Sequence, residues 1–334
     1  NLKIDETRIP QDGRFSTRIG GKDIDFRVST FPTVLGEKVA LRILDPTKAV
    51  TAIDDLGLTE RNRQIVERAI KKPYGMILAT GPTGSGKTTT LYAILRILNK
   101  EGVNIMTLED PVEYFIDGVN QSQVKPEIGY EFATGLRHML RQDPDIMMVG
   151  EIRDEETAAL AIHSALTGHL LLSTLHTNNA LGVIPRLIDL GIKPYLIPPT
   201  LNIAIAQRLV RKLCKDCRER VKPKMETRDL ILKELDNLPP LFKKELQIPK
   251  NFIVWAPGSC KSCNNTGYSG RTGVFEVLEM TDELAEIVLR EPSEAKIEEQ
   301  AKQQGFVSMM QDGMLKVLKG ITSIEEVLRI AEEK

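Results

Sequence analysis

The sequence has little of what several large classes of protein require. It contains four cysteines and one tryptophan, and aromatic residues make up only 5% of its 334 residues. Nucleic-acid-binding grooves combine a basic surface with stacking aromatic side chains, but here 45 Lys and Arg residues are balanced by 46 Asp and Glu residues. The composition therefore gives no support to nucleic-acid binding, and we expect no nucleic-acid partner.

Long apolar segments are also missing. The nearest candidate, around residues 195–206, is interrupted by Pro198, Pro199 and Asn202, and a membrane-spanning helix needs about 20 consecutive apolar residues. No signal peptide is recognisable. The chain starts at Asn1 inside a strand-rich segment, so we interpret it as a fragment whose upstream part is missing.

Near the N-terminus, residues 22–29 and 37–44 alternate between polar and apolar side chains. This period of two predicts strands with one solvent-facing side. Four arginines lie in or beside these strands, namely Arg14, Arg18, Arg27 and Arg42. We predict an arginine-bearing sheet over residues 13–45, followed by a linker over residues 46–55.

Short apolar segments alternate with helical patterns between residues 56 and 200. The predicted strands are 75–80, 103–108, 145–150 and 169–176, and the predicted helices are 87–99, 131–142 and 154–166, the last capped by Asp154. This order predicts an α/β fold with a mostly parallel sheet covered by helices. A cysteine-rich insert (211–270), a strand (273–280) and a helical tail (281–334) should follow, with Ser323 and Glu326 forming a capping box at the last helix.

The segment from Gly81 to Thr88 reads GPTGSGKT and matches the phosphate-binding P-loop pattern in full. Its glycines allow backbone N–H groups to surround phosphate oxygens, Lys87 adds a positive charge, and the Thr88 hydroxyl can bind Mg²⁺. The predicted nucleotide-binding residues are Gly81, Pro82, Thr83, Gly84, Ser85, Gly86, Lys87, Thr88 and Thr89. The sequence therefore predicts ATP and Mg²⁺ as ligands.

Hydrolysis also needs an acidic group near the γ-phosphate. Glu151 and Glu113 each follow a predicted strand, and ligands of open α/β sheets bind at the carboxyl ends of strands. The alternative for either residue is an ordinary solvated loop acid. His169 and His176 bracket another strand, and we interpret them as polar sensors near the nucleotide, with a structural role as the alternative.

Arginines could stabilise the charge of the transition state. Arg27 and Arg42 lie on separate predicted strands that could pair, and a guanidinium binds γ-phosphate oxygens through a planar fork. We predict that both reach a bound nucleotide, and ordinary sheet surface is the alternative. Arg137 and Arg141, four residues apart on one helix face, are further candidates.

All four cysteines occur in two Cys-x-x-Cys pairs, Cys214 with Cys217 and Cys260 with Cys263, and 42 residues separate the pairs. Four thiolates suit tetrahedral Zn²⁺ in a closed structural site. The gap exceeds the usual zinc-ribbon spacing, so we expect a helical segment, 228–246, to loop out. A redox dithiol and an unmetallated pair of turns are the alternatives, and the cysteine usage favours a reducing compartment.

In combination, these motifs resemble those of the type II/type IV secretion ATPase superfamily, in its branch of type II secretion and type IV pilus assembly ATPases. The P-loop corresponds to the family's Walker A motif, Thr107–Glu113 (TLEDPVE) to its Asp box, Ile146–Asp154 to Walker B, and Gly168–Thr177 to the His box. The four-cysteine element is also typical of the assembly and secretion enzymes.

The resemblance implies that residues 1–45 are the C-terminal part of an arginine-bearing α+β domain. It also implies a RecA-like P-loop ATPase core over residues 56–334 that contains the zinc insert and the tail. It implies that Glu113 is a catalytic acid and that Glu151 lies beside the attacking water. It further implies a cytoplasmic homo-hexamer, held at the inner membrane by a platform protein and a docking protein, that hydrolyses ATP to power type IV pilus assembly or type II secretion. From the residues alone, a P-loop nucleic-acid motor and a nucleotide-gated scaffold remain alternatives.

Overall fold

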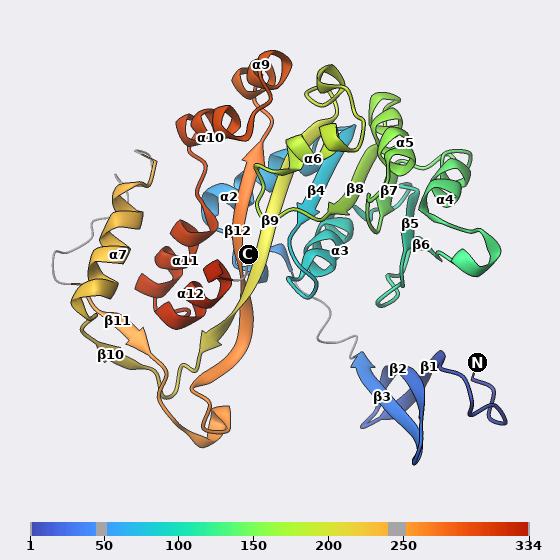
Figure 1. The fold of residues 1–334 in the computed structure, drawn as a ribbon, viewed down its shortest axis with the longest axis horizontal. Helices are drawn as coiled ribbons and strands as arrows, with labels where there is room; N and C mark the ends of the chain where they lie inside the picture. Colours follow the sequence, from blue (N-terminus) through green and yellow to red (C-terminus); the bar gives the residue numbers. More distant parts are fainter. Residues whose placement is uncertain (1, 45–51, 240–251, 333–334) are drawn as a thin grey trace.

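The computed structural model describes residues 2–44, 52–239 and 252–332, and its main body is a seven-stranded sheet with helices on both faces (Figure 1). The strand order is β12-β9-β4-β8-β7-β5-β6. Neighbouring strands are parallel except β12, which is antiparallel to β9. The strands are β4 (Gly75–Thr80), β5 (Ile105–Glu109), β6 (Val119–Gln123), β7 (Ile146–Val149), β8 (Leu170–Leu175), β9 (Leu201–Leu213) and β12 (Tyr268–Glu279). The predicted α/β fold with a mostly parallel sheet is confirmed.

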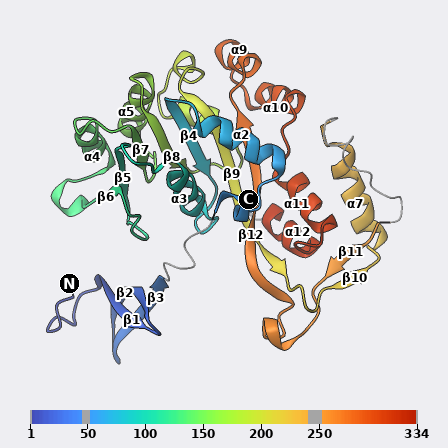
Figure 2. The same cartoon turned by 180° about the vertical axis from the view of Figure 1, so that it is seen from behind.

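Apolar residues on both sides of the strands hold the helices in place, as expected for a parallel sheet that is buried on both faces. In β4, Ile77 packs in one core with helices α2 and α3, whereas Leu78 packs in the opposite core with α4, α5, α6, α9 and α10. Figure 2 shows α2 in front of the sheet when the molecule is seen from behind. The first five of these helices are α2 (Glu60–Ile70), α3 (Lys87–Leu98), α4 (Phe132–Met139), α5 (Glu155–Leu166) and α6 (Val183–Asp189).

Patterns of neighbouring residues in the sequence predicted several of these elements correctly. The predicted strand 75–80 coincides with β4, and α3 begins at Lys87 as predicted and ends one residue early. The predicted cap of α5 is confirmed, because the Asp154 carboxylate accepts a hydrogen bond from the backbone N–H of Thr157 at 2.8 Å. These features depend on neighbouring residues only, so the sequence encodes them directly.

The cysteine-rich insert lies at the end of a long antiparallel pair formed by β9 and β12. Their ladder extends to Leu213 opposite Tyr268, so β12 begins five residues before the strand predicted at 273–280. Beyond the pair lie β10 (Glu219–Val221), β11 (Val254–Ala256) and α7 (Met225–Asp236).

The helix expected at 228–246 was placed wrongly. It begins at Met225 and ends at Asp236, and residues 240–246 lie outside the described part. It does not loop out, because Ile231 and Leu235 are buried in a third core shared with α11 and α12. An amphipathic helix needs a partner for its apolar side, and the tail provides one.

The tail is helical, as predicted. Its helices are α9 (Asp282–Arg290), α10 (Glu294–Gln303), α11 (Met309–Leu318) and α12 (Ile324–Glu332). The last helix begins where the Ser323 pattern placed it, but the structure describes a complete capping box at α11, between Ser308 and Gln311. Among the described helices, none combines the length and hydropathy needed to span a membrane.

A separate three-stranded antiparallel sheet contains β1 (Gln11–Ile19), β2 (Lys22–Thr33) and β3 (Gly36–Leu44). Its register places Arg14 opposite Arg27, and Arg27 opposite Arg42. Directly opposite residues share a face of a sheet, so these three arginines form one row. Of the predicted linker, residues 46–51 lie outside the described part, and Ile53–Leu56 form a short 3-10 helix (η1).

Candidate nucleotide-binding site

The P-loop connects the carboxyl end of β4 to the start of α3. Its backbone requires glycines: Gly81 has φ of 135°, Gly84 has φ of 78° and Gly86 has φ of 92°, values that side-chain-bearing residues rarely adopt. A Cβ atom at Gly81 would also lie 2.4 Å from the Gln207 carbonyl oxygen. The loop thus leads directly into the N-terminus of α3, and unpaired N–H groups at a helix N-terminus are suited to anion binding.

A cavity of about 750 Å³ opens over this loop, a volume within the range of small-molecule sites. Its lining residues are Arg42, Ile43, Thr83, Gly84, Ser85, Gly86, Lys87, Thr88, Thr89, Glu113, Tyr114, Glu151, Thr174, His176, Leu209 and Arg271. Of the predicted nucleotide-binding residues, Gly81 and Pro82 are absent from this lining, and their carbonyl oxygens accept hydrogen bonds from Lys87 at 2.7 and 3.1 Å. Burial lowers the pKa of Lys87, and the charge of Glu151 opposes that shift.

The Glu151 carboxylate, just beyond β7, is held by two side chains. Its Oε2 lies 3.0 Å from Nε2 of His176, and its Oε1 lies 3.2 Å from Nη1 of Arg153. These contacts involve both carboxylate oxygens and limit rotation of the carboxylate. The structure therefore places His176 against the predicted catalytic acid, and it adds Arg153, which sequence reasoning did not single out.

A smaller hollow of about 130 Å³ adjoins the main cavity and is lined by Thr88, Glu113 and Glu151, among others. Glu113 and Glu151 line both spaces. A hydroxyl and two carboxylates are the hard oxygen ligands that Mg²⁺ prefers, so these residues fit a Mg²⁺ ion and an ordered water beside a phosphate.

Glu109 is a site residue that sequence reasoning passed over. It lines the smaller hollow and is 3% exposed. Its carboxylate accepts hydrogen bonds from Thr107 at 2.6 Å, from Gln121 at 3.2 Å and from the Tyr92 hydroxyl. Burial raises the pKa of Glu109. The network fixes the turn that leads to Glu113. Glu109 could have been identified from the sequence as an acid at the end of an apolar strand.

The arginine row faces the Glu113 loop. Arg42 lines the main cavity, and Arg27 lines a neighbouring hollow of about 250 Å³ together with Glu113. Arg14 donates to the carbonyl oxygens of Val112 at 3.1 Å and Glu113 at 3.2 Å. Arg14 thus attaches the small sheet to the loop, a contact across 98 residues that no local sequence pattern indicates.

Three other candidates lie elsewhere. His169 precedes β8, at the amino end of the strand, and contacts Thr167 and Ser164. Because the nucleotide cavity lies at the carboxyl ends, the expectation that His169 is near the nucleotide of its own chain is wrong. Arg137 pairs with Glu156, and Arg141 contacts His138 at 2.7 Å; neither arginine lines the cavity.

The two cysteine pairs come together although they are far apart in sequence. All four Sγ atoms lie within 4.8 Å of one another. Cys214 and Cys260 are separated by 3.8 Å, as are Cys217 and Cys263. A tetrahedral Zn²⁺ with bonds of about 2.3 Å requires Sγ separations of about 3.8 Å, whereas a disulfide needs about 2.05 Å. The residues fit a zinc ion with no open position.

The strand order and the P-loop with its flanking carboxylates are those of a RecA-like P-loop ATPase. A family profile described as "Type II/IV secretion system protein" matches residues 1–329, and the chain belongs to that family.

Individual relatives agree with this assignment. The chain is 47% identical to the type II secretion system protein E of Aeromonas hydrophila over 99% of its length, covering 64% of that protein. It is 45% identical to the type IV pilus assembly ATPase PilB of Acinetobacter baylyi, covering 99% of this chain and 56% of that one. The chain thus spans less than two thirds of the length of these relatives.

Solved structures give the same fold. A crystal structure of the pilus retraction motor PilT with bound ADP superposes with a TM-score of 0.69 at 26% identity, over 96% of this chain and 77% of that one. The ATPase DotB of Legionella pneumophila has the same fold, with a TM-score of 0.68 at 24% identity, over 98% of this chain and 78% of that one.

Proposed function

We propose that this chain hydrolyses ATP to ADP and phosphate and uses the energy to power type II protein secretion or type IV pilus assembly. One observation carries the proposal: the Glu151 carboxylate, held by His176 and Arg153, shares a cavity with Lys87 of the P-loop. The ADP in the PilT structure supports a nucleotide as the ligand of this fold.

The residues divide the chemistry between them. The P-loop N–H groups bind the phosphates, and Lys87 exchanges its carbonyl partners for phosphate oxygens. Thr88 and Glu113 would hold Mg²⁺, which would neutralise phosphate charge. Glu151 orients a water and accepts its proton as that water attacks the γ-phosphorus and ADP leaves. Arg42 stabilises the negative charge on the γ-phosphate oxygens.

We propose that Cys214, Cys217, Cys260 and Cys263 hold one structural Zn²⁺ per chain. Metal analysis of the purified protein should find one zinc, and Cys260→Ser should lower it sharply because the closed site loses a thiolate. The P-loop variant Lys87→Ala is the matched control and should keep its zinc. Four titratable thiols without zinc in the wild type would contradict the assignment.

The zinc insert and the P-loop pack against different hydrophobic cores. Residues around β4 and α3 pack with each other, whereas α7 and β11 pack with the tail. Cys260→Ser should therefore still bind ATP while its insert unfolds locally, which proteolysis of the insert would reveal.

We propose a homo-hexamer at the cytoplasmic side of the inner membrane, which acts on a membrane platform protein and is attached by a docking protein. The names of the relatives, components of secretion and pilus systems, support this placement.

A comparison of activators tests this role. ATP turnover should rise when a soluble fragment of the platform protein is added and should not respond to DNA. The reason is that the chain has a near-zero net charge and few aromatic residues, so it lacks the general features of a nucleic-acid groove. Stimulation by DNA but not by the platform fragment would favour the nucleic-acid motor instead.

A further inference from the structure

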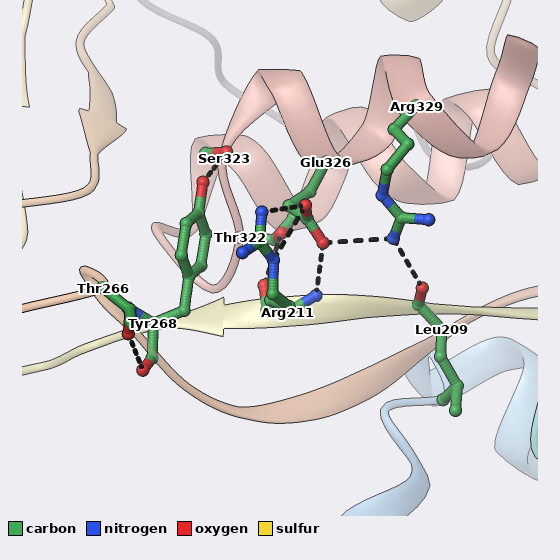
Figure 3. Close-up of polar contacts among 8 residues, drawn as sticks. All are labelled: Leu209, Arg211, Thr266, Tyr268, Thr322, Ser323, Glu326 and Arg329. Atoms are coloured by element: carbon green, nitrogen blue, oxygen red, sulfur yellow. Dashed lines mark hydrogen bonds and ion pairs between the residues drawn. The ribbon is translucent and has the colours of Figure 1, made fainter. Parts of the chain in front are cut away.

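A buried carboxylate, that of Glu326, connects helix α12 to β9 (Figure 3). Glu326 is 2% exposed and accepts hydrogen bonds from the Arg211 backbone N–H at 2.8 Å and from its guanidinium at 3.0 and 2.7 Å. Burial raises the pKa of Glu326, but hydrogen bonds from Arg211 and Arg329 outweigh it and hold the pKa at about 2. Glu326 is therefore ionised at neutral pH.

Arg329 lies one helical turn after Glu326 in α12. It connects the Glu326 carboxylate to Leu209, two residues before Arg211 in β9. Its Nη2 donates to Oε2 of Glu326 at 3.2 Å and to the backbone oxygen of Leu209 at 3.3 Å (Figure 3). We call Glu326 and Arg329 the α12 clamp. The clamp thus binds β9 at two points, Leu209 and Arg211.

The clamped part of β9 is a wall of the nucleotide cavity. The Leu209 side chain lines the cavity, and both of its methyl carbons lie 3.6 Å from a Cβ built at Gly86 of the P-loop. Gln207, two residues earlier on the same face of β9, accepts a hydrogen bond from Thr90 at 2.6 Å. The position of β9 therefore affects the P-loop directly.

This wall lies on the nucleoside side of the cavity. In the sheet, β9 and β12 are on one side of β4, whereas β8, β7 and β5, which lead to His176, Glu151 and Glu113, are on the other. A nucleotide whose γ-phosphate faces Glu151 must extend its nucleoside toward Leu209 and Arg271. Both residues line the cavity, and an apolar side chain and a planar guanidinium each suit contact with an aromatic base.

The turn that precedes α12 contacts the cysteine insert. Ser323, just before α12, contacts the hydroxyl of Tyr268 at 2.9 Å, and the Arg211 guanidinium lies 4.1 Å from the Tyr268 ring centroid. Arg218, next to Cys217, donates to the carbonyl oxygen of Gly320. The turn before α12 therefore lies between the insert and the cavity wall.

We propose that the α12 clamp positions the β9 wall of the nucleotide cavity, so that Arg329 sets nucleotide affinity from outside the cavity and links the site to the four-cysteine insert. The proposal rests on the nucleotide site proposed above. Arg329 is a positioning residue, because it acts through Leu209 and does not line the cavity.

The test measures binding of a non-hydrolysable ATP analogue to the full chain. Arg329→Gln should raise the Kd about threefold to tenfold, the scale of one or two lost hydrogen bonds, and leave kcat nearly unchanged because no catalytic group moves. Arg329→Lys should restore most of the affinity, since an ammonium group can donate to both oxygens. The matched control is Arg290→Gln, which removes an exposed arginine paired with Glu286 on α9.

A second measurement reports the link to the insert. Trp255, the single tryptophan of the chain, lies against Gly320, because a Cβ built there would be 2.5 Å from its ring. Saturating analogue should change Trp255 fluorescence in the wild type, and Arg329→Gln should reduce that change.

An unchanged Kd in Arg329→Gln, an equal loss in Arg290→Gln, or an undiminished fluorescence change would overturn the proposal. Failure of the wild type to bind the analogue would instead overturn the proposed nucleotide site, so the two failures are distinguishable.

Discussion

Glu151→Gln is expected to lower ATP turnover by about a hundredfold or more, the effect of losing a general base, while ATP binding is kept. Glutamine has the same shape as glutamate but cannot accept the proton of the attacking water. The Glu151 carboxylate lies in the cavity with Lys87 and contacts His176 and Arg153, so the variant changes the chemistry and preserves the packing. Phosphate release and equilibrium ATP binding, measured on the same preparation, separate the two effects.

The matched control is Glu155→Gln, which removes an exposed acid in the first turn of α5, outside the cavity lining. It should turn over ATP like the wild type. Near-normal turnover in Glu151→Gln would show that another group activates water, and Glu113, which lines both hollows, would take that role.

Arg42→Ala is expected to lower turnover by roughly a thousandfold, at the low end of the effects of transition-state arginines, with little change in ATP affinity. Arg42 lines the cavity of its own chain, on the sheet that Arg14 attaches to the Glu113 loop. Its charge is needed mainly as negative charge develops on the γ-phosphate oxygens. Arg18→Ala, on the same sheet but outside the cavity lining, is the control and should remain active.

Mixing subunits distinguishes the two ways in which Arg42 can act. If it serves its own chain, as the geometry supports, Arg42→Ala subunits mixed with Glu151→Gln subunits each lack one essential group, and turnover stays low. If it serves a neighbouring chain, some mixed sites contain both groups and activity returns. Unchanged turnover in Arg42→Ala alone would show that Arg42 is an ordinary surface residue of the sheet with no catalytic role.

Features that depend on a few neighbouring residues could be predicted from the sequence. The P-loop, β4 and the Asp154 cap each occupy one short segment, and their glycines, apolar residues and capping carboxylate specify the local conformation. The four cysteines could be grouped because no other cysteine competes for a ligand position.

Contacts across long sequence separations could not be predicted in this way. Arg14 and Val112 are 98 residues apart, and Arg211 and Glu326 are 115 apart. Nothing in the local pattern around these arginines distinguishes them from exposed ones, because their partners depend on strand register and helix packing. The buried hydrogen bonds of Glu109 likewise combine residues from β5, β6 and α3.

Two predictions, for His169 and for the helix at 228–246, were wrong for physical reasons. His169 was grouped with His176 because both flank β8, but in a parallel sheet only the carboxyl ends of the strands face the ligand. The helix expected to loop out of the cysteine insert instead supplies Ile231 and Leu235 to the core of the tail. Burying apolar area stabilises such packing by about 25 cal/mol per Å². The charge pattern along the segment does not reveal which core its apolar side chains will join.

The most direct test of ATP hydrolysis at this P-loop is steady-state phosphate release by the wild-type chain with ATP and Mg²⁺. Phosphate release should continue over many turnovers and should be lost in Lys87→Ala, whose nucleotide binding should be weakened because the phosphates lose a positive charge. Tight ATP binding by the wild type with no phosphate release would contradict the account and identify the chain as a nucleotide-gated scaffold.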